Sequence, residues 1–307
     1  MHVAICIVGF RNTDDIVGCV AALGRQTHAD FEVVICENGG PPAYDRLRAC
    51  LPERLPGGQA LRVELAPGNL GYAGGINVCM RLSPDADAWW VLNPDTLPDP
   101  DALAELVAAL RSGAHDLVGG VIYDETGTVG SYGGRWRKWL ARAESIGIGR
   151  KLSDPVDDGA VNRSLGYISG CSMLVGRFFV DRTGPMREDY FLYCEEVEWS
   201  LRGLQRGMRL GFAPAARVLH RQGTTTGAGA AIRERGKLPI YLDERNKMLL
   251  TRDLFPVRLP VAAGAAMALI LLRFGRRRAW RQLGYAVQGW GAGLLNRRGV
   301  PDWLARD

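Results

Sequence analysis

The chain has 307 residues, 47% of them apolar and 23% charged, and a net charge of +5. This length allows one large domain or one domain with an appendage, and the composition is ordinary for a soluble globular protein. Seven cysteines at irregular spacing, without a C-x-x-C pair, exclude a disulfide framework and indicate a reducing compartment, the cytoplasm. The apolar start MHVAICIVGF lacks a basic lead and a cleavage site, so we interpret it as a strand and not as a signal peptide.

Short apolar runs alternate with helical patterns in the first part of the chain. The predicted strands lie within residues 3–9, 31–40, 60–69 and 87–95, and the predicted helices within 14–26, 71–83 and 99–113. Strands separated by helices predict an α/β fold with a Rossmann-like, mostly parallel sheet flanked by helices. Ligands bind such sheets at the carboxyl ends of the strands. That edge carries Phe10–Asn12, Glu37–Asn38, Pro67–Asn69 and Asn93–Asp95.

The second half has a less regular pattern. Residues 119–158 are rich in glycine and give no clear prediction. The remaining predictions are a strand with a short helix at 164–184, a helix at 195–207, two short strands around Pro214, a mobile loop at 220–236 and helices from Lys237 onward.

The buried run WWVL ends on Asn93-Pro94-Asp95. A carboxylate in a tight turn after a strand can hold a divalent cation whose other ligands are phosphate oxygens and water. The alternative is an ordinary turn, because all three residue types favour turns. Taken alone, this motif favours the turn.

The segment GNLGYAGGIN, residues 68–77, places glycines between a strand and a helix. Glycines there let the backbone approach a phosphate at the helix N-terminus. Close packing of the helix on the sheet explains them equally well. The segment is neither a Walker loop nor a G-x-G-x-x-G motif.

Two further features can carry chemistry. Glu195 and Glu196 follow an aromatic run and begin a helix, where one of them can act as a general base. The alternative is that they only complement the helix dipole. His220 ends a strand before a glycine-threonine loop, and is either a metal ligand or a structural histidine.

Together, and in this order, these segments resemble the family 2 glycosyltransferases of the GT-A fold, especially the rhamnosyltransferase-like branch of bacterial polysaccharide biosynthesis. The resemblance covers about residues 3–252. It is carried by IVGFRN, ICENGG, GNLGYAGGINVCM, VLNPD, YISGCSMLV, YFLYCEEVEWSLR, RVLH and YLDERNKMLL.

The resemblance implies a set of donor and metal residues. Asp95 matches the acid that binds a divalent cation, Mg²⁺ or Mn²⁺, and His220 matches a histidine that completes that site. Residues implied to bind the nucleoside-diphosphate sugar are Phe10, Asn12, Glu37, Asn69, Gly71, Tyr72, Asn77, Asn93, Asp95 and Arg202. Arg202 has an alternative role, because it can pair with Glu198 one helical turn earlier.

The resemblance also implies an inverting transfer with Glu196 as the base. The sequence departs from the family pattern twice, since Asn93 replaces an acid and Glu196 replaces an aspartate. The second departure leaves Glu195 as a rival base and Glu198 as a less favoured one. Implied acceptor residues are Gly170, Cys171, Tyr193 and Trp199, although core packing is the favoured role of Trp199. Residues 221–229 are a candidate lid.

We expect two regions, a catalytic domain at 1–255 and a helical extension at 256–307. The run Leu259–Leu272 is apolar, shorter than a spanning helix, and followed by Arg273 and Arg276–Arg278. We interpret it as an interfacial helix at the inner membrane, the alternatives being a core helix or a homodimer interface. The expected acceptor is a saccharide or a polyprenyl-linked oligosaccharide. A nucleic-acid partner is disfavoured, because no aromatic stacking platform accompanies the arginines.

Two other functions stay open. A sugar-phosphate nucleotidyltransferase also combines an α/β fold with nucleotide and metal, but its first loop usually has more glycines than IVGFRNTDD. A nucleotide-sugar-binding protein that has lost catalysis is compatible with Asn93 and Glu196. The sequence leaves the donor base, thymine or uracil, and the sugar undecided, and rhamnose is an inference from the branch.

Overall fold

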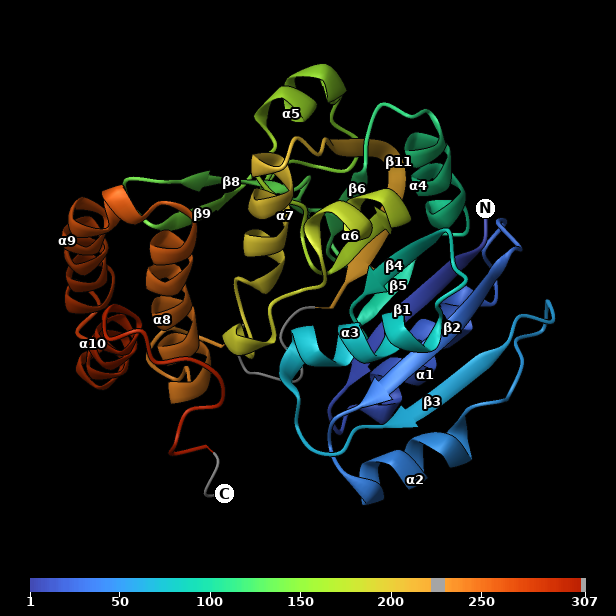
Figure 1. The fold of residues 1–307 in the computed structure, drawn as a ribbon, viewed down its shortest axis with the longest axis horizontal. Helices are drawn as coiled ribbons and strands as arrows, with labels where there is room; N and C mark the ends of the chain where they lie inside the picture. The colour runs from blue at the N-terminus through green and yellow to red at the C-terminus, as the bar shows by residue number, and fades with distance from the viewer. Residues whose placement is uncertain (222–229, 305–307) are drawn as a thin grey trace.

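The computed structural model describes residues 1–221 and 230–304. Within these residues, nine strands form one mixed sheet with the order β3-β2-β1-β4-β10-β6-β11-β5, and β7 pairs with β6 (Figure 1). The parallel part contains β1 (Val3–Gly9), β2 (Phe31–Glu37), β3 (Leu61–Leu65) and β4 (Ala88–Leu92). Antiparallel β10 (Ser172–Gly176) separates β4 from β6 (Leu117–Tyr123). The predicted α/β class is confirmed.

Side-chain alternation along the strands divides the core into two layers. Ile5 and Ile7 of β1 pack in a cluster with residues of α1, α2 and α4, whereas Cys6 and Val8 pack in a second cluster with residues of α3, α6 and α7. The helices are α1 (Thr13–Leu23), α2 (Pro41–Cys50), α3 (Gly71–Leu82), α4 (Ala102–Arg111), α6 (Arg177–Thr183) and α7 (Glu195–Gln205). Helices therefore cover both faces and leave the carboxyl edge of the strands for the site.

The irregular middle of the chain holds more structure than its sequence predicted. It contains β7 (Val129–Ser131), the hairpin of β8 (Gly134–Arg137) and β9 (Arg142–Ser145), and α5 (Asp158–Ser164). These elements are short, so their patterns are weak in the sequence.

The prediction of two strands around Pro214 is wrong. One strand, β11 (Leu210–His220), runs through this segment and pairs with β6 on both sides of an irregularity between Phe212 and Arg217. Pro214 lies in that irregularity, where it removes no ladder hydrogen bond. The uninterrupted strand carries His220 to the carboxyl edge of the sheet.

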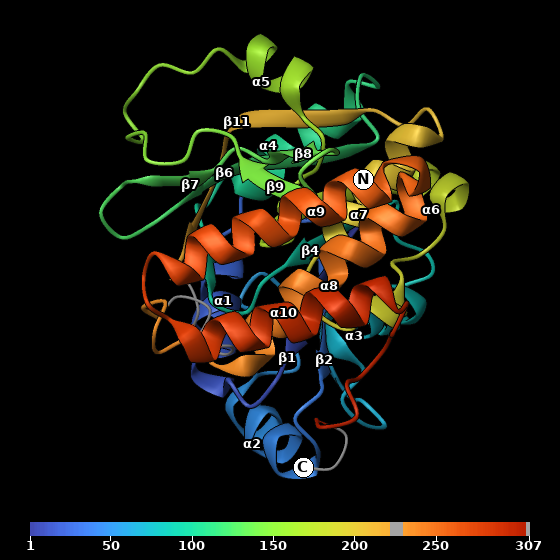
Figure 2. The same cartoon turned by 90° about the vertical axis from the view of Figure 1, so that its left-hand side faces the viewer.

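The chain ends in a group of helices. They are α8 (Lys237–Leu254), η2 (Pro256–Arg258), α9 (Leu259–Ile270), η3 (Leu271–Gly275) and α10 (Trp280–Leu294) (Figure 2). A Cβ at Gly289 of α10 would lie 2.2 Å from the Tyr241 carbonyl oxygen of α8, so glycine is required for this close contact. The division of the chain at residue 255 stays a prediction. Helix α8 precedes this residue and packs against α10, the last helix of the group.

The apolar helix near the C-terminus is longer than predicted. The helical stretch Pro256–Gly275 has 20 residues because η2 and η3 extend α9 at both ends. Within the described residues it is the one stretch that is long and apolar enough to cross a membrane, and 28% of it is buried. Length and composition alone are weak evidence for a span, because a core helix passes the same test.

Candidate active site

Asp95 and His220 lie side by side at the carboxyl edge of the sheet. The short strand β5 (Thr96–Pro98) pairs with the end of β11, and Thr96 is the partner of His220 in this register. The imidazole Nε2 consequently lies 3.2 Å from a carboxylate oxygen of Asp95. Burial lowers the pKa of His220, but the hydrogen bonds to Asp95 and Cys171 outweigh burial and raise it to about 10.

This pair fits a divalent cation. A carboxylate oxygen and an imidazole nitrogen are both ordinary ligands of Mn²⁺, and both side chains are mostly buried, at 10% and 14% exposure. No cluster of three or more His, Cys, Asp or Glu side chains suited to a metal occurs in residues 1–221 and 230–304. A cation held here would therefore take its remaining ligands from a phosphate-bearing substrate and from water.

Gly170 and Cys171 connect this pair to the acidic helix start. The Sγ of Cys171 lies 3.6 Å from Nδ1 of His220, and the Cys171 carbonyl accepts a hydrogen bond from the Asn93 amide. On the other side, a Cβ at Gly170 would lie 3.3 Å from Cγ of Glu196. The Gly170 carbonyl also accepts a 2.8 Å hydrogen bond from the Tyr72 hydroxyl. The residues predicted to face an acceptor therefore lie between the predicted metal pair and Glu196.

Glu195 and Glu196 have different surroundings, although they are adjacent. Glu195 is 3% exposed, and its Oε2 has no hydrogen-bond partner in the described part of the chain. Burial, together with the charge of Glu196, holds the pKa of Glu195 well above its usual value. Glu196 is only half-buried, and its burial-raised pKa is moderated by hydrogen bonds from backbone amides. Glu196 is thus the more accessible of the two carboxylates.

A strained loop carries these two acids. Phe191, Tyr193 and Cys194 all have positive φ values, of 68°, 75° and 67°, which non-glycine residues rarely adopt. Asn246 of α8 is fully buried and its Nδ2 donates hydrogen bonds to the carbonyls of Tyr190, Leu192 and Tyr193. The C-terminal helices therefore hold the acidic helix start in place.

Arg245 supports the same loop. Its guanidinium donates hydrogen bonds to the carbonyls of Tyr190 and Gly299, at 2.8 and 2.7 Å. Sequence reasoning assigned no role to Arg245 or Asn246. The sequence contains one signal for them, because an arginine and an asparagine occur inside the segment YLDERNKMLL, where the buried face of a helix would otherwise be apolar.

The predicted donor residues at the ends of β1 and β2 form one rim. The Glu37 carboxylate is buried and accepts hydrogen bonds from the amides of Arg11 and Gly39, so it joins the two strand ends. Asn12 accepts a hydrogen bond from the Phe10 amide, and the Phe10 side chain is 36% exposed.

The glycine-rich segment forms the neighbouring part of the rim. The Asn69 side chain accepts a hydrogen bond from the Gly71 amide at the start of α3. Gly71 has φ +72°, and a Cβ there would lie 2.1 Å from the Phe191 carbonyl oxygen. Close packing, one of the two alternatives for this segment, therefore explains Gly71.

Three predicted site residues have structural roles instead. Trp199 is fully buried, donates to the Gly184 carbonyl and packs edge-on against Phe179, so it cannot serve as a sugar platform. Asn77 is 3% exposed and hydrogen bonds to the backbone of Met186.

The third is Arg202. Its guanidinium forms a 2.8 Å ion pair with Glu198 and donates to the Pro185 carbonyl, which is the alternative that the i, i+4 spacing offered. The candidate lid at 221–229 lies outside the described residues except for Arg221, whose amide donates to the Asp95 carbonyl.

Comparisons with known proteins show the family of the chain. Residues 4–181 match the family profile described as "Glycosyl transferase family 2". The chain is 23% identical over 249 residues to the low-salt glycan biosynthesis hexosyltransferase Agl10 of Haloferax volcanii, covering 76% of each protein. It is 26% identical over 238 residues to an N-acetylglucosaminyl-diphospho-decaprenol L-rhamnosyltransferase of Mycobacterium tuberculosis, covering 69% of this chain and 73% of the relative.

Solved structures share the fold. A mannosyltransferase of Pyrobaculum calidifontis in complex with GDP-Man and Mn²⁺ aligns with a TM-score of 0.57 and 17% identity over 96% of this chain and 88% of that one. GalNAc-T7 with UDP, GalNAc and Mn²⁺ aligns with a TM-score of 0.60 and 14% identity over 82% of this chain and 48% of that one. The family match covers more than half of the residues, so the chain belongs to glycosyl transferase family 2 and is a glycosyltransferase with the GT-A fold.

Proposed function

We propose that this glycosyltransferase moves a hexosyl group, rhamnose in the first instance, from a dTDP- or UDP-linked donor to a hydroxyl of a lipid-linked saccharide, with inversion. The observation that carries the proposal is the contact series from Asp95 through His220, Cys171 and Gly170 to Glu196. In this series Asp95 and His220 lie on one side of Gly170 and Cys171, and Glu196 lies on the other, which supports the proposal. The rhamnosyltransferase relative supports the choice of sugar.

In this proposal Asp95 and His220 hold Mn²⁺ or Mg²⁺ at the donor diphosphate. The cation supplies charge neutralisation for the departing nucleoside diphosphate. Glu37, Phe10 and Asn12 form the rim where the nucleoside would lie, at the carboxyl ends of β1 and β2. Asn93 lies between this rim and Cys171, with its amide directed at the Cys171 sulfur.

Glu196 is the proposed general base. It accepts the proton of the acceptor hydroxyl as that oxygen attacks the anomeric carbon from the face opposite the leaving group. A single displacement of this kind inverts the centre and needs no covalent intermediate. Glu195 is the poorer candidate because its carboxyl group is buried, and burial together with the charge of Glu196 raises its pKa well above the usual value. The Tyr72 hydroxyl donates a hydrogen bond to the Gly170 carbonyl and so positions the predicted acceptor residues Gly170 and Cys171.

We also propose a location at the cytoplasmic face of the inner membrane. The helical stretch from η2 to η3 exposes an apolar stripe, with Val257 90%, Val261 58% and Leu271 51% exposed. These positions recur at helical spacing on one face. Arginines follow the stripe directly, at positions 276 to 278, where lipid phosphates would attract them.

A donor screen tests the proposed reaction. The purified protein with Mn²⁺ or Mg²⁺ would meet a panel of nucleotide sugars, and released nucleoside diphosphate would be measured. We expect release from one donor that disappears with EDTA and in Asp95→Ala. A folded, nucleotide-binding protein that releases nothing, even with a polyprenyl-diphosphate-linked saccharide present, would favour the binding-protein alternative.

A further inference from the structure

A large cavity lies between the C-terminal helices and the β8–β9 hairpin. Its volume is about 1040 Å³, and its walls come from the β8–β9 region, from residues 232 and 235, from α8, and from α9 with η3 and the two residues after it. Most of these walls lie beyond residue 181, where the family match ends. Neither the proposed donor site nor the base uses this cavity.

The cavity is strongly cationic. Six of its lining side chains are basic and two are acidic. The two acids, Asp243 and Glu244, pair with Lys247, whose Nζ lies 2.6 and 3.1 Å from their carboxylates, and Glu244 also lies 3.9 Å from Arg273. Within the described residues, Arg142, Arg235, Arg276 and Arg277 form no ion pair with a carboxylate, so the cavity has an uncompensated positive charge.

Arg235 has the environment of an incomplete anion site. Its Nε is buried and has no hydrogen-bond partner in the described part of the protein. Burial, and then the like charge of Arg273, lower the pKa of Arg235. A guanidinium that is desolvated beside another guanidinium is stabilised when an anion joins them, and phosphate oxygens match its fork of donors.

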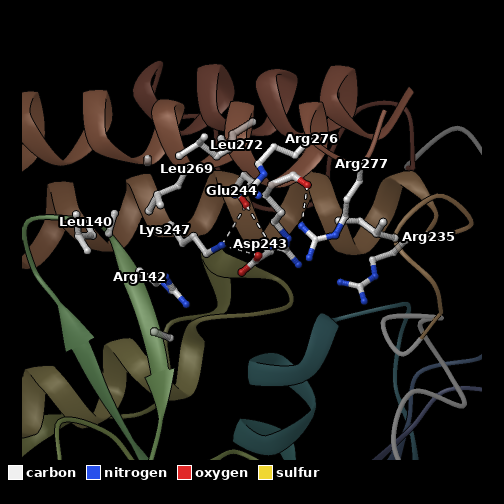
Figure 3. Close-up of a pocket in the computed structure, with 16 residues that line it drawn as sticks. Leu140, Arg142, Arg235, Asp243, Glu244, Lys247, Leu269, Leu272, Arg276 and Arg277 are labelled. Atoms are coloured by element: carbon white, nitrogen blue, oxygen red, sulfur yellow. Dashed lines mark hydrogen bonds and ion pairs between the residues drawn. The ribbon is translucent and has the colours of Figure 1, made fainter. Parts of the chain in front are cut away.

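The opposite end of the cavity carries leucines beside Arg142. Figure 3 shows Leu140 and Leu269 at one end, and Arg235 and Arg277 at the other. Leu272, which is 54% exposed, lines the cavity and lies in the helical stretch that bears the exposed apolar stripe. An occupant therefore needs an anionic group joined to a hydrocarbon chain that continues toward this surface.

The cationic end extends toward the loop that carries the proposed base. A second cavity of about 200 Å³ shares Arg235, Asp243 and Arg273 with the first and adds Tyr193 to its lining. Tyr193 precedes the acidic pair by two residues. Asp243 is close enough to Glu196 for its charge to raise the pKa of that carboxylate. A saccharide attached to an anion in the large cavity would extend past Tyr193 toward Glu196.

We propose that this cavity binds the acceptor, with its arginine end holding the diphosphate of an isoprenoid-linked saccharide and its leucine end holding the first part of the hydrocarbon chain. This inference rests on the proposed function and adds the location and the chemistry of acceptor recognition. Arg235, Arg276 and Arg277 are the phosphate ligands, and Leu269 and Leu272 contact the chain.

Binding of farnesyl diphosphate and of inorganic pyrophosphate to the full chain tests the site by calorimetry. The cavity variant is Arg235→Gln with Arg277→Gln. The matched control is Arg281→Gln with Arg297→Gln, which removes the same charge from exposed positions outside the cavity. We expect the cavity variant to bind both probes at least tenfold more weakly and the control to stay within twofold of the unmodified protein. Leu269→Ser should weaken the binding of farnesyl diphosphate and leave the binding of pyrophosphate unchanged.

Two further arms separate the explanations. Nucleoside-diphosphate release by the same preparations reports the proposed function independently of the cavity. If release persists and farnesyl diphosphate binds the cavity variant as tightly as the control, the cavity proposal is overturned while the function stands. Vesicles of phosphatidylcholine with phosphatidylglycerol test the other source of phosphate. Loss of vesicle binding in the cavity variant, with farnesyl diphosphate binding unchanged, would assign the arginines to the membrane surface and overturn the proposal.

Discussion

The two sides of the site are built in different ways. Asp95 directly precedes β5 and His220 ends β11, so the ladder between these two strands fixes their 3.2 Å approach. Glu196 begins a helix after a strained loop, and side chains of α8 hold that loop. Strand register fixes the position of the first pair, whereas the position of the loop depends largely on the side chains of Asn246 and Arg245. The donor side should therefore tolerate distant changes that the acceptor side does not.

The largest expected effect is at the base. Glu196→Gln keeps the shape of the side chain but removes its proton acceptor, so we expect the transfer rate to fall about 10²- to 10⁴-fold. Nucleotide binding should be unchanged, because Glu196 lies on the acceptor side. Glu195→Gln is the matched control and should lose far less, since the Glu195 side chain is buried and Glu196 is the more accessible carboxylate. Equal losses in the two variants would remove the distinction between them.

The donor side depends on the cation-binding pair of Asp95 and His220. Asp95→Asn removes the charged oxygen, and we expect at least about a 100-fold loss of metal-dependent turnover, because even residues that only support metal ligands cost 10- to 100-fold. Titration with Mn²⁺ should show a higher concentration for half-maximal rate. A variant with unchanged Mn²⁺ dependence would place the cation elsewhere.

Asn246→Ala tests the support of the acidic loop. It leaves the Leu192 and Tyr193 carbonyls without this donor beside strained backbone, while the Tyr190 carbonyl keeps Arg245, and we expect the free energy of unfolding to fall by about 2 kcal/mol. Transfer should fall more than nucleotide binding, because the loop carries the base. Urea denaturation and single-turnover rates measure the two effects. Gln288→Ala, an exposed amide on α10, is the control and should change neither.

The contact between α8 and α10 is tested by two glycines of the same helix. Gly289→Ala puts a methyl group against the Tyr241 carbonyl, so we expect a loss of about 1–3 kcal/mol in stability. Gly284→Ala meets nothing within 4 Å and should stabilise α10 by about 0.5–1 kcal/mol. Thermal unfolding of both variants measures these changes in stability. If Gly289→Ala also stabilises the protein, the contact between α8 and α10 does not require glycine at position 289.

The smallest expected effect concerns Asp189 of η1 (Glu188–Tyr190). Its carboxylate forms ion pairs with Arg187, just before η1, and with Arg298, near the end of the chain. Burial raises the pKa of Asp189, but the two arginines outweigh burial and lower it below 3.8. A lowered pKa contributes stability above the ordinary pKa, and that contribution is lost as pH falls through the folded value. From about pH 5 to pH 3 the unmodified protein should lose stability more steeply than Asp189→Asn. If stability depends on pH equally in the two proteins, this ion network does not contribute to the pH dependence of stability.

Much of the donor side could be predicted from local sequence. The buried runs and helical patterns predicted the sheet, and the carboxyl-edge rule placed Asp95 with Glu37 and Asn69 along one rim. The surroundings of Trp199, Asn77 and Arg202 could not be predicted in this way, because a motif position does not reveal which way a side chain points. Burial and specific partners, Gly184, Met186 and Glu198, decided those three.

The sequence by itself determined the α/β class and the family, because hydrophobic periodicity and short polar motifs are local properties of the chain. Only the tertiary structure decided the pairing of Asp95 with His220, the support of the acidic loop by Asn246, and the cationic cavity beside Glu196. Each joins segments far apart in the sequence, as in the 125 residues from 95 to 220. Contacts of that kind depend on strand register and helix packing, which no local pattern encodes.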